Sequence, residues 1–492
     1  MLRGISGPWG APATVCDSPL NLIDATFDWL EKNWKNKLDF IIWTGDNSRH
    51  DNDENIPRTP TELFKLNKFI TEKFLKTFSN MREQAPHFIP IIPSIGNNDI
   101  YPNNIIGAGP NELLSIIHDI WSPFIPKGQH KTFLDGGYYY KEVIPGKLIV
   151  VSLNTLYFYN SNTAVNGCKE EGQPGTIEMK WLNDVLKKAY KLGMKVYLTG
   201  HVAPRAKQYT KSCYKQYGRL SLKYQDIILG HYYGHSNMDH FFFITANGVK
   251  KGHPLDDDNE VLSLDDDDLY EEEEEIVDDD DDDETVEDQE KQINENENGK
   301  IVTKVKNIKK YMKKLLNHYR TLPPLTDDVV KDYAVVHINP SIIPTFFPAL
   351  RIFKYNTTEV TNRNTNAISD LDAPSRKNTF LTPLGYTQYF INLTHANLYP
   401  NVTPEFTVEY TTWDDYFLKD LTIPSWIQLA RKIVNDGLTG LNSALWEKIQ
   451  EHLLVGTRDL INRKSQSSYQ QCIYSKCRAK GPEDYIASEL SF

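Results

Sequence analysis

Apolar residues recur along the chain at two spacings, one typical of helices and one typical of buried strands. Residues 18–38, 61–80 and 177–192 place apolar side chains three and four positions apart, which predicts amphipathic helices. Shorter apolar runs predict strands at residues 39–43, 87–92, 195–201, 226–230, 333–338 and 350–355, and a hairpin at residues 137–155 that turns at Pro145-Gly146. Helices that alternate with short apolar strands indicate a layered α/β core.

The acidic residues are concentrated in one segment. Residues 256–290 contain 23 Asp or Glu and no Lys or Arg, whereas residues 300–320 contribute a charge of +8. Without residues 256–290 the formal net charge changes from −12 to +11. Because like charges repel and bury nothing, residues 250–300 are expected to be disordered, and the Lys-rich part could form a short basic helix. Three roles stay open: a solvated loop without a dedicated role, an arm that binds polyanions, or an acid–base clasp within the chain.

A chain of 492 residues is long enough for a large core and a smaller second region. We expect four parts: residues 1–249 as the first part of the core, 250–320 as an acidic and then Lys-rich disordered insert, 321–379 as the last core strands, and 380–492 as a smaller helical C-terminal subdomain. No run of about 18 apolar residues is present, and the first residues lack the apolar core of a signal peptide.

Cysteines and glycosylation sequons favour a lumenal, oxidising compartment over the cytosol. Of the five cysteines, Cys472 and Cys477 are the closest pair, and we also expect a pair between Cys168 and Cys213. The odd cysteine, Cys16, is then expected to have lost a partner that lay upstream. The three sequons, which predict glycosylation, start at Asn356, Asn392 and Asn401.

Four predicted strands end in glycine followed closely by a side chain that can bind a metal. These side chains are Asp46, Asn97, His201 and His235. Open α/β sheets gather ligands at the carboxyl ends of their strands, and glycine permits a close approach of the backbone to an ion. A carboxylate, an amide oxygen and two imidazoles suit zinc, manganese or iron. The sequence therefore predicts a metal site at this edge, with His231 as an alternative to His235.

These blocks resemble, in order, those of the calcineurin-like metallophosphoesterases. The residues that carry the resemblance are Gly45-Asp46, His50-Asp51, Gly96-Asn97-Asn98-Asp99, Gly200-His201 and Gly234-His235 with Asn237. In further motifs the sequence is similar to the acid-sphingomyelinase-related branch of this family, and most of all to fungal vacuolar endopolyphosphatases. That closer match lies in Cys16-Asp-Ser-Pro19, Trp43-Thr-Gly-Asp46, Gly96-Asn-Asn-Asp99 and Asn339-Pro-Ser-Ile-Ile-Pro344. The resemblance covers roughly residues 10–250 and 330–490.

The resemblance implies a fold of two mixed β-sheets flanked by helices, and two divalent metals (Zn, Mn, Co or Fe). It implies cleavage of phosphoester or phosphoanhydride bonds by a metal-bound hydroxide. By position, Asp46 would bridge both metals, Asn97, His201 and His235 would complete one shell, and Asn237 would bind the other metal.

Two departures from the family pattern concern the catalytic groups. No Asp-x-His block precedes Asp46, so we expect a sequence that begins too late, with one metal and weak or no activity. Asn98 stands where many relatives have a catalytic histidine, which makes His50 the better candidate to protonate the leaving oxygen. Arg49 is expected either to bind a phosphate oxygen or to form a salt bridge with Asp51 or Asp53.

The leading hypothesis is endo-cleavage of inorganic polyphosphate in the lumen of a fungal vacuole. The alternatives are a phosphodiesterase of the acid-sphingomyelinase type, or a metal-poor protein that acts as a binding scaffold. We expect no nucleic-acid partner, and a membrane anchor only on a missing N-terminal segment.

Overall fold

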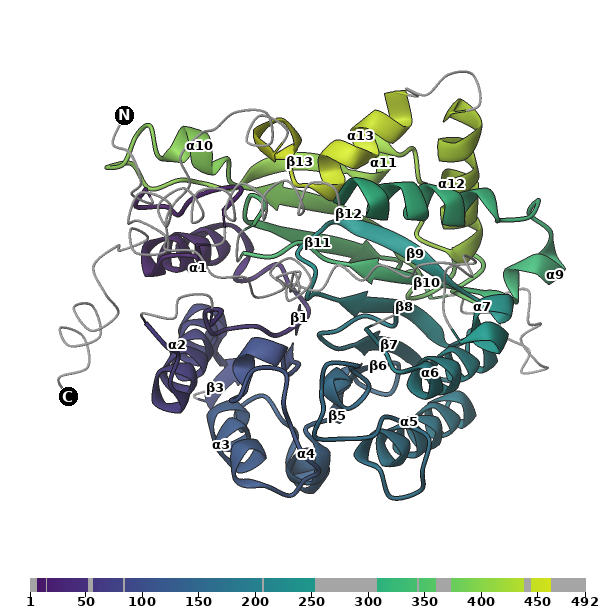
Figure 1. Cartoon of the computed structure of the whole chain (residues 1–492), viewed down its shortest axis with the longest axis horizontal. Helices are drawn as coiled ribbons and strands as arrows, with labels where there is room; N and C mark the ends of the chain where they lie inside the picture. Colours follow the sequence, from purple (N-terminus) through teal and green to yellow (C-terminus); the bar gives the residue numbers. More distant parts are fainter. Residues whose placement is uncertain are drawn as a thin grey trace, which may run out of the picture.

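The largest sheet of the protein has six strands in the order β5–β6–β7–β8–β10–β9 (Figure 1). The computed structural model describes residues 7–14, 16–51, 56–82, 85–205, 208–252, 308–342, 345–359, 373–437 and 444–461. Within the sheet, β6, β7, β8 and β10 are parallel, and the outer strands β5 and β9 are antiparallel to their neighbours. The six strands are β5 (Tyr139–Ile144), β6 (Leu148–Ser152), β7 (Lys195–Thr199), β8 (Ile228–Tyr233), β9 (His240–Thr245) and β10 (Tyr333–Ile338).

A second layer of strands packs against one face of this sheet. It consists of the parallel pair β1 (Ile41–Trp43) and β4 (Ile91–Pro93), and of the antiparallel β11 (Ala349–Tyr355), β12 (Pro383–Phe390) and β13 (Thr407–Thr411). The ring of Phe353 on β11 lies 5.0 Å from that of Tyr232 on β8, and Phe40 lies 6.2 Å from Tyr197 on β7. These aromatic contacts join the two layers and confirm an α/β fold with two mixed layers of sheet.

Amphipathic helices cover the sheets (Figure 1). On the six-stranded sheet, α5 (Pro174–Lys191) packs against β7, and α6 (Lys211–Lys223) packs against β9 and β10. The ring of Trp426 on α12 (Ile423–Gly437) lies 4.4 Å from Phe241 and 4.8 Å from His337 of the sheet. The other elements are α1 (Leu20–Trp34), α2 (Pro60–Phe78), β2 (Ser79–Arg82), β3 (Ala85–Phe88), η1 (Asn97–Asp99), α3 (Glu112–Trp121), η2 (Lys127–Gln129), α4 (His130–Gly136), η3 (Thr155–Tyr157), α7 (Ala246–Lys251), α9 (Asp327–Val330), α10 (Leu393–Ala396), α11 (Thr412–Asp415) and α13 (Ala444–Leu453).

The predicted helices at 18–38, 61–80 and 177–192 are confirmed as α1, α2 and α5. The apolar run at 87–92 is not one strand, because it divides into β3 and β4 on either side of Pro90, which cannot donate to a ladder. The expectation of a helical region from residue 380 onward is wrong for residues 383–390 and 407–411, where β12 and β13 extend the sheet that begins at β11.

The Lys-rich part of the insert forms a helix whose described residues are 308–320. Its apolar face is buried against the core, and Tyr319 stacks on Phe241 of β9 with the ring centroids 5.0 Å apart. The Tyr319 hydroxyl also donates a hydrogen bond to the backbone oxygen of Phe241. The short basic helix expected for the Lys-rich part is therefore present, and the broader expectation of a disordered insert over 250–320 is wrong for these residues, because apolar residues three and four positions apart outweigh the positive charge. The acidic residues 256–290 lie outside the described residues.

In the described part of the chain, no helix combines the length and the apolar character that a membrane crossing requires.

Two histidines buried in the six-stranded sheet make the fold sensitive to acid. Burial lowers the pKa of His231, whose Nδ1 lies 2.7 Å from the Tyr217 hydroxyl, to about 3, and lowers the pKa of His337 to about 3. Between pH 6.5 and 3 the unfolded state therefore binds more protons than the folded state, so the free energy of unfolding falls as the pH falls. We expect a loss of about 1.4 kcal/mol per histidine for each pH unit below 6.5.

Calorimetric Tm values between pH 7 and pH 4.5 measure this effect. His231→Gln should give a shallower dependence on pH, whereas replacement of the exposed His395 by glutamine should not change it. Equal slopes for the His231 variant and the unmodified chain would contradict the assignment.

Candidate metal centre

The predicted ligands meet at the carboxyl ends of two pairs of parallel strands. Asp46 and Asn97 follow the neighbouring strands β1 and β4, and His201 and His235 follow the neighbouring strands β7 and β8. One ligand atom from each of Asp46, His201 and His235 lies within 4.8 Å of the others. The two layers of sheet thus bring four ligands from four loops to one place.

Asn97 links the two histidines. Its Oδ1 atom lies 2.8 Å from His201 Nε2 and 2.9 Å from His235 Nδ1. Asp46 Oδ2 lies 2.9 Å from the same His201 nitrogen, and the two histidine nitrogens are 3.2 Å apart. Asn97, His201 and His235 are each at most 2% exposed, so little water reaches these atoms.

The hydrogen bond of His201 to the backbone determines whether its other ring nitrogen, Nε2, can act as an acceptor. His201 Nδ1 lies 2.7 Å from the carbonyl oxygen of Thr44, which can only accept, so Nδ1 carries the proton. In the neutral ring Nε2 is then an acceptor, and it faces the oxygens of Asp46 and Asn97. Acceptors this close repel one another unless a positive charge lies between them. The donor set and the second-sphere hydrogen bond therefore fit a divalent cation.

The charge state of Asp46 supports the same conclusion. Burial raises its pKa, but a positive charge on the surrounding His201, His235 and His50 rings, together with the hydrogen bond to His201, would hold the pKa well below its usual value. A bound cation between neutral His201 and His235 would supply positive charge at the same place. The backbone amide of Asn98 donates to Oδ1 at 2.9 Å, and its side-chain amide donates to Oδ2 at 3.1 Å. Asp46 is therefore an ionised carboxylate with both oxygens oriented.

The loops that present the ligands have unusual backbone conformations. Asp46, His235 and Asn237 have φ values of +61°, +69° and +54°, in the left-handed region that few residues other than glycine adopt. A Cβ at Gly96 would lie 2.1 Å from Asp46 Oδ1, and a Cβ at Gly45 would lie 2.6 Å from the Ser94 carbonyl oxygen. Both glycines are needed because the two ligand loops touch.

Asp99 connects these two loops, and the sequence analysis did not identify it as a functional residue. Its carboxylate accepts backbone N–H groups from Gly96 at 2.9 Å, Asp46 at 2.9 Å and Asn47 at 2.7 Å, and also the Asn47 side-chain amide. Burial, followed by the nearby Asp46 charge, raises its pKa to about 6. Its position at the end of the Gly96-Asn-Asn-Asp99 motif could have indicated this role from the sequence.

Arg58 supports the same loop from the other side and was also missed. It is 2% exposed, and its guanidinium donates to the backbone oxygens of Asn98 at 2.7 Å, Ile100 at 3.1 Å and Arg49 at 3.3 Å. Burial lowers the pKa of Arg58 from its usual value. No local motif indicates this residue, because all three carbonyls belong to other segments of the chain.

His50, the predicted proton donor, is oriented by Asp17. Its Nδ1 lies 2.7 Å from Asp17 Oδ1, and its backbone N–H donates to Oδ2 at 3.1 Å. Asp17 belongs to the Cys16-Asp-Ser-Pro19 motif but was not predicted to be functional. Its neighbour Cys16 is disulfide-bonded, so the expectation that Cys16 has lost its partner is wrong.

The guanidinium of Arg49 is held by a carboxylate. Its Nε and Nη2 atoms donate to the two oxygens of Glu62 at 2.7 and 3.1 Å, and Nη2 also donates to the Ile56 carbonyl oxygen. Among the described residues the ion-pair partner is thus Glu62, not Asp51, while Asp53 lies outside them. Phosphate binding by Arg49 stays a prediction.

A cavity of about 1020 Å³ adjoins the ligands. Asp46, His201, His235 and Asn237 line it, together with residues 37–49, which include β1, and residues 349–355, which form β11. Apolar side chains of α1 and α2, such as Leu30 and Phe74, complete its lining. Asn237, the candidate ligand of a second metal, therefore borders the same cavity as the cluster.

The other predicted site residues have structural environments. His231 lies within β8, where Tyr217 contacts it, and is not part of the cluster. Cys168 and Cys213 form a disulfide between the loop before α5 and helix α6. The predicted pair Cys472–Cys477 lies outside the described residues. Of the sequon asparagines, Asn392 and Asn401 are exposed, and Asn356 donates a side-chain hydrogen bond to Asn378 at 2.7 Å.

Comparisons with known proteins agree with this geometry. The family model described as "Calcineurin-like phosphoesterase" matches residues 16–237, which include all the ligands named above. An endopolyphosphatase of Neurospora crassa is 30% identical over 565 residues, which cover 88% of this chain and 73% of the relative. An endopolyphosphatase of Cryptococcus neoformans is 39% identical and covers 72% of this chain.

The chain spans about half the length of several curated relatives it matches, for example 49% of the Cryptococcus protein. A further relative, the endopolyphosphatase of Saccharomyces cerevisiae, is 33% identical over 75% of this chain and 58% of its own length. A solved structure described as "GAP50 the anchor in the inner membrane complex of Plasmodium" is only distantly similar, with a TM-score of 0.28, 12% identity, and coverage of 49% of this chain and 67% of its own.

Calcineurin-like phosphoesterases depend on divalent metals, and the Asp46, His201 and His235 cluster is the candidate site for such an ion. The chain therefore belongs to the endopolyphosphatase family of the calcineurin-like metallophosphoesterases.

Proposed function

We propose that the chain is a metal-dependent hydrolase that cuts phosphoanhydride bonds inside chains of inorganic polyphosphate. The observation that carries the proposal is the buried cluster of acceptors formed by Asp46, Asn97 and His201, with His235 beside them. The relatives' printed name, endopolyphosphatase, supports polyphosphate as the substrate and does not favour a phosphodiesterase of the sphingomyelinase type.

The residues of the cluster have different proposed roles in catalysis. A bound divalent cation (Zn, Mn, Co or Fe) would act as a Lewis acid and neutralise the charge that develops on the phosphate. Asp46, Asn97, His201 and His235 would hold it, and Asn237 would serve a second ion. Asn98 fixes both oxygens of Asp46 and thereby orients the ligand.

His50 is the proposed general acid for the leaving phosphate. Asp17 holds its Nδ1, which fixes the orientation of the ring. His50 is 9% exposed, and its charge acts on the Asp46 carboxylate, so it lies within electrostatic range of the cluster. Arg49 precedes His50 in the chain and is the proposed contact for a phosphate oxygen.

Asp17→Asn should lower kcat by about 10- to 100-fold, because the ring of His50 loses the carboxylate that orients it. The metal content should not change, because the described contacts of Asp17 are with His50 and not with a ligand of the cluster. Steady-state cleavage of polyphosphate measures kcat, and atomic emission spectroscopy measures the bound metal. Asp28→Asn, an exposed change on α1, is the matched control. An unchanged kcat with an unchanged pH profile would show that the Asp17–His50 pair has no catalytic role.

The function itself is tested by incubating the protein with long-chain polyphosphate and zinc, manganese or cobalt. Gel electrophoresis should show chains of intermediate length before short products accumulate, which is the signature of endo-cleavage. Release of orthophosphate without intermediates, or no cleavage with any of the metals, would refute the proposal. Sphingomyelin assayed in parallel tests the phosphodiesterase alternative.

The proposed compartment is the vacuolar lumen. The disulfide between Cys168 and Cys213 fits an oxidising compartment, and the exposed sequon residues Asn392 and Asn401 are open to glycosylation. A faster gel migration after treatment with an endoglycosidase would support this location, and a protein without glycans would argue against it.

A further inference from the structure

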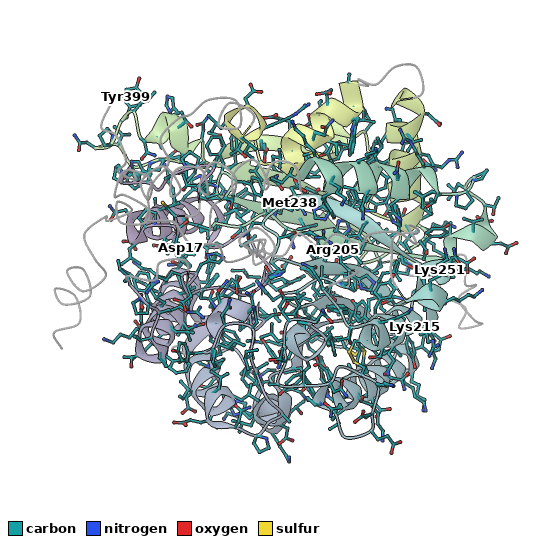
Figure 2. All side chains as sticks on the ribbon, viewed as in Figure 1. Asp17, Arg205, Lys215, Met238, Lys251 and Tyr399 are labelled. Carbon is teal, nitrogen blue, oxygen red and sulfur yellow. A yellow bond between two sulfur atoms is a disulfide. The ribbon has the colours of Figure 1, made fainter. Side chains whose placement is uncertain are left out.

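Arg205 is a buried arginine whose charge is not compensated in the described part of the chain. It lies on the loop after β7, four residues after His201, and is 6% exposed. Its guanidinium lies 4.4 Å from the ring centroid of Tyr311 on the helix at 308–320. Its Nη1 atom is buried and has no hydrogen-bond partner among these residues. Figure 2 shows Arg205 and Met238 in the central region of the molecule, with Asp17 on the left.

The groups around Arg205 do not supply the missing negative charge. Burial raises the pKa of Tyr311, so the phenol stays neutral. Burial, followed by the charge of Arg205, lowers the pKa of His240 well below its usual value, so this imidazole is neutral as well. The carboxylate of Asp239, which precedes His240 in the chain, is paired with Arg351 and accepts from the Tyr410 hydroxyl.

A buried guanidinium without a partner is unfavourable, because it has lost its hydration and gained no ion pair in return. Charged side chains are almost never this deeply buried unless they are paired. The cation–π contact with Tyr311 holds the guanidinium in place, and Nη1 is left without a partner among the described residues. This arrangement is suited to an anion that comes from outside the protein.

Arg205 belongs to the same loop as a ligand of the metal centre, because it follows His201 by four residues. The Tyr311 hydroxyl, under the guanidinium, lies 2.6 Å from His240 Nε2, and His240 follows the ligand His235 by five residues. The backbone N–H of Gly234 donates to the His201 carbonyl oxygen, so the two ligand loops are adjacent. Ser236 adds a buried hydroxyl oxygen that also has no partner among the described residues.

We propose that Arg205 binds a phosphoryl group of the polyphosphate chain next to the one that is cleaved, an inference that rests on the proposed function. The planar guanidinium can donate two parallel hydrogen bonds to two oxygens of one phosphate, which a lysine cannot do. A substrate with many phosphates gains from such a second contact, and we expect a single orthophosphate to gain less from it.

The test compares Arg205→Met, Arg205→Lys and the control Arg219→Met, which removes an exposed arginine on α6. Loss of a charge-assisted bidentate contact should raise KM for long-chain polyphosphate by about 10- to 100-fold with little change in kcat. Lysine should recover part of the loss, and Arg219→Met should stay within about twofold of the unmodified chain.

Thermal unfolding separates ligand binding from a structural role. Without ligand, Arg205→Met should have a Tm equal to or above that of the unmodified chain, because an unpaired buried charge is removed. Tripolyphosphate should raise the Tm of the unmodified chain and of Arg219→Met but not that of Arg205→Met.

Two results would overturn the inference: an unchanged KM and an unchanged tripolyphosphate shift in Arg205→Met, or a large fall of its ligand-free Tm that lysine restores. If the unmodified chain cleaves no polyphosphate, the proposed function fails, and the dependence of the tripolyphosphate shift on Arg205 still decides this inference.

Discussion

Replacement of Asp46 by asparagine is expected to lower the rate of polyphosphate cleavage by about 10³-fold or more, since several kcal/mol of metal-dependent stabilisation are lost. The carboxylate is the one anionic group among the three clustered ligands that the structure describes. An amide in its place removes the negative charge and directs an N–H group toward either His201 or the amide of Asn98. Gel electrophoresis of polyphosphate measures the rate, and atomic emission spectroscopy measures the loss of metal.

The exposed Asp28 on α1 provides the control, because Asp28→Asn makes the same chemical change far from the cluster. A variant at position 46 that keeps both its metal and its activity would show that the ion binds elsewhere.

Asp99→Ala is expected to lower the free energy of unfolding by about 3–5 kcal/mol, a range typical of breaking a buried charged network. Three backbone N–H groups, from Gly96, Asp46 and Asn47, lose their acceptor in a place that water does not reach. Each unsatisfied donor costs about 1–3 kcal/mol. Urea denaturation of the metal-free chain measures the change.

The same substitution should also weaken metal binding, because Asp99 fastens the loop of Asp46 to the loop of Asn97. Asp119→Ala is a suitable control, since that side chain is 84% exposed on α3. Equal urea midpoints for the Asp99 and Asp119 variants would mean that the ligand loops are held by other contacts.

The ligand cluster could be predicted from the sequence because its signals are local. Asp46, Asn97, His201 and His235 each follow glycine at the end of an apolar strand, and parallel strands place such ends at one edge. The groups that orient the ligands could not be predicted in this way. Asp99 acts on a residue 53 positions away, and Asp17 acts on one 33 positions away, so both depend on how the loops meet.

The fold shows the same division between local and distant signals. The apolar repeats of α1, α2 and α5 are visible in single segments, and these helices were predicted. Residues 308–320 were expected as a possible short basic helix in an otherwise disordered insert, but the packing of its apolar face, which includes Tyr319, on β9 is a distant contact that this segment alone does not show. Strands β12 and β13 were missed because their pairing with β11 is not visible in any one segment.

The cavity next to the cluster also affects the motions of the protein. β1 pairs with β4 alone among the described strands, and its other edge faces the cavity that β11 also lines. The amides of Ile41–Trp43 are therefore expected to exchange their hydrogens faster than those of the fully buried β6. A cation held by Asp46 and His201 would cross-link the β1–β4 pair to the six-stranded sheet. Loading the metal should therefore slow this exchange, and the ion would then hold the two layers of sheet together.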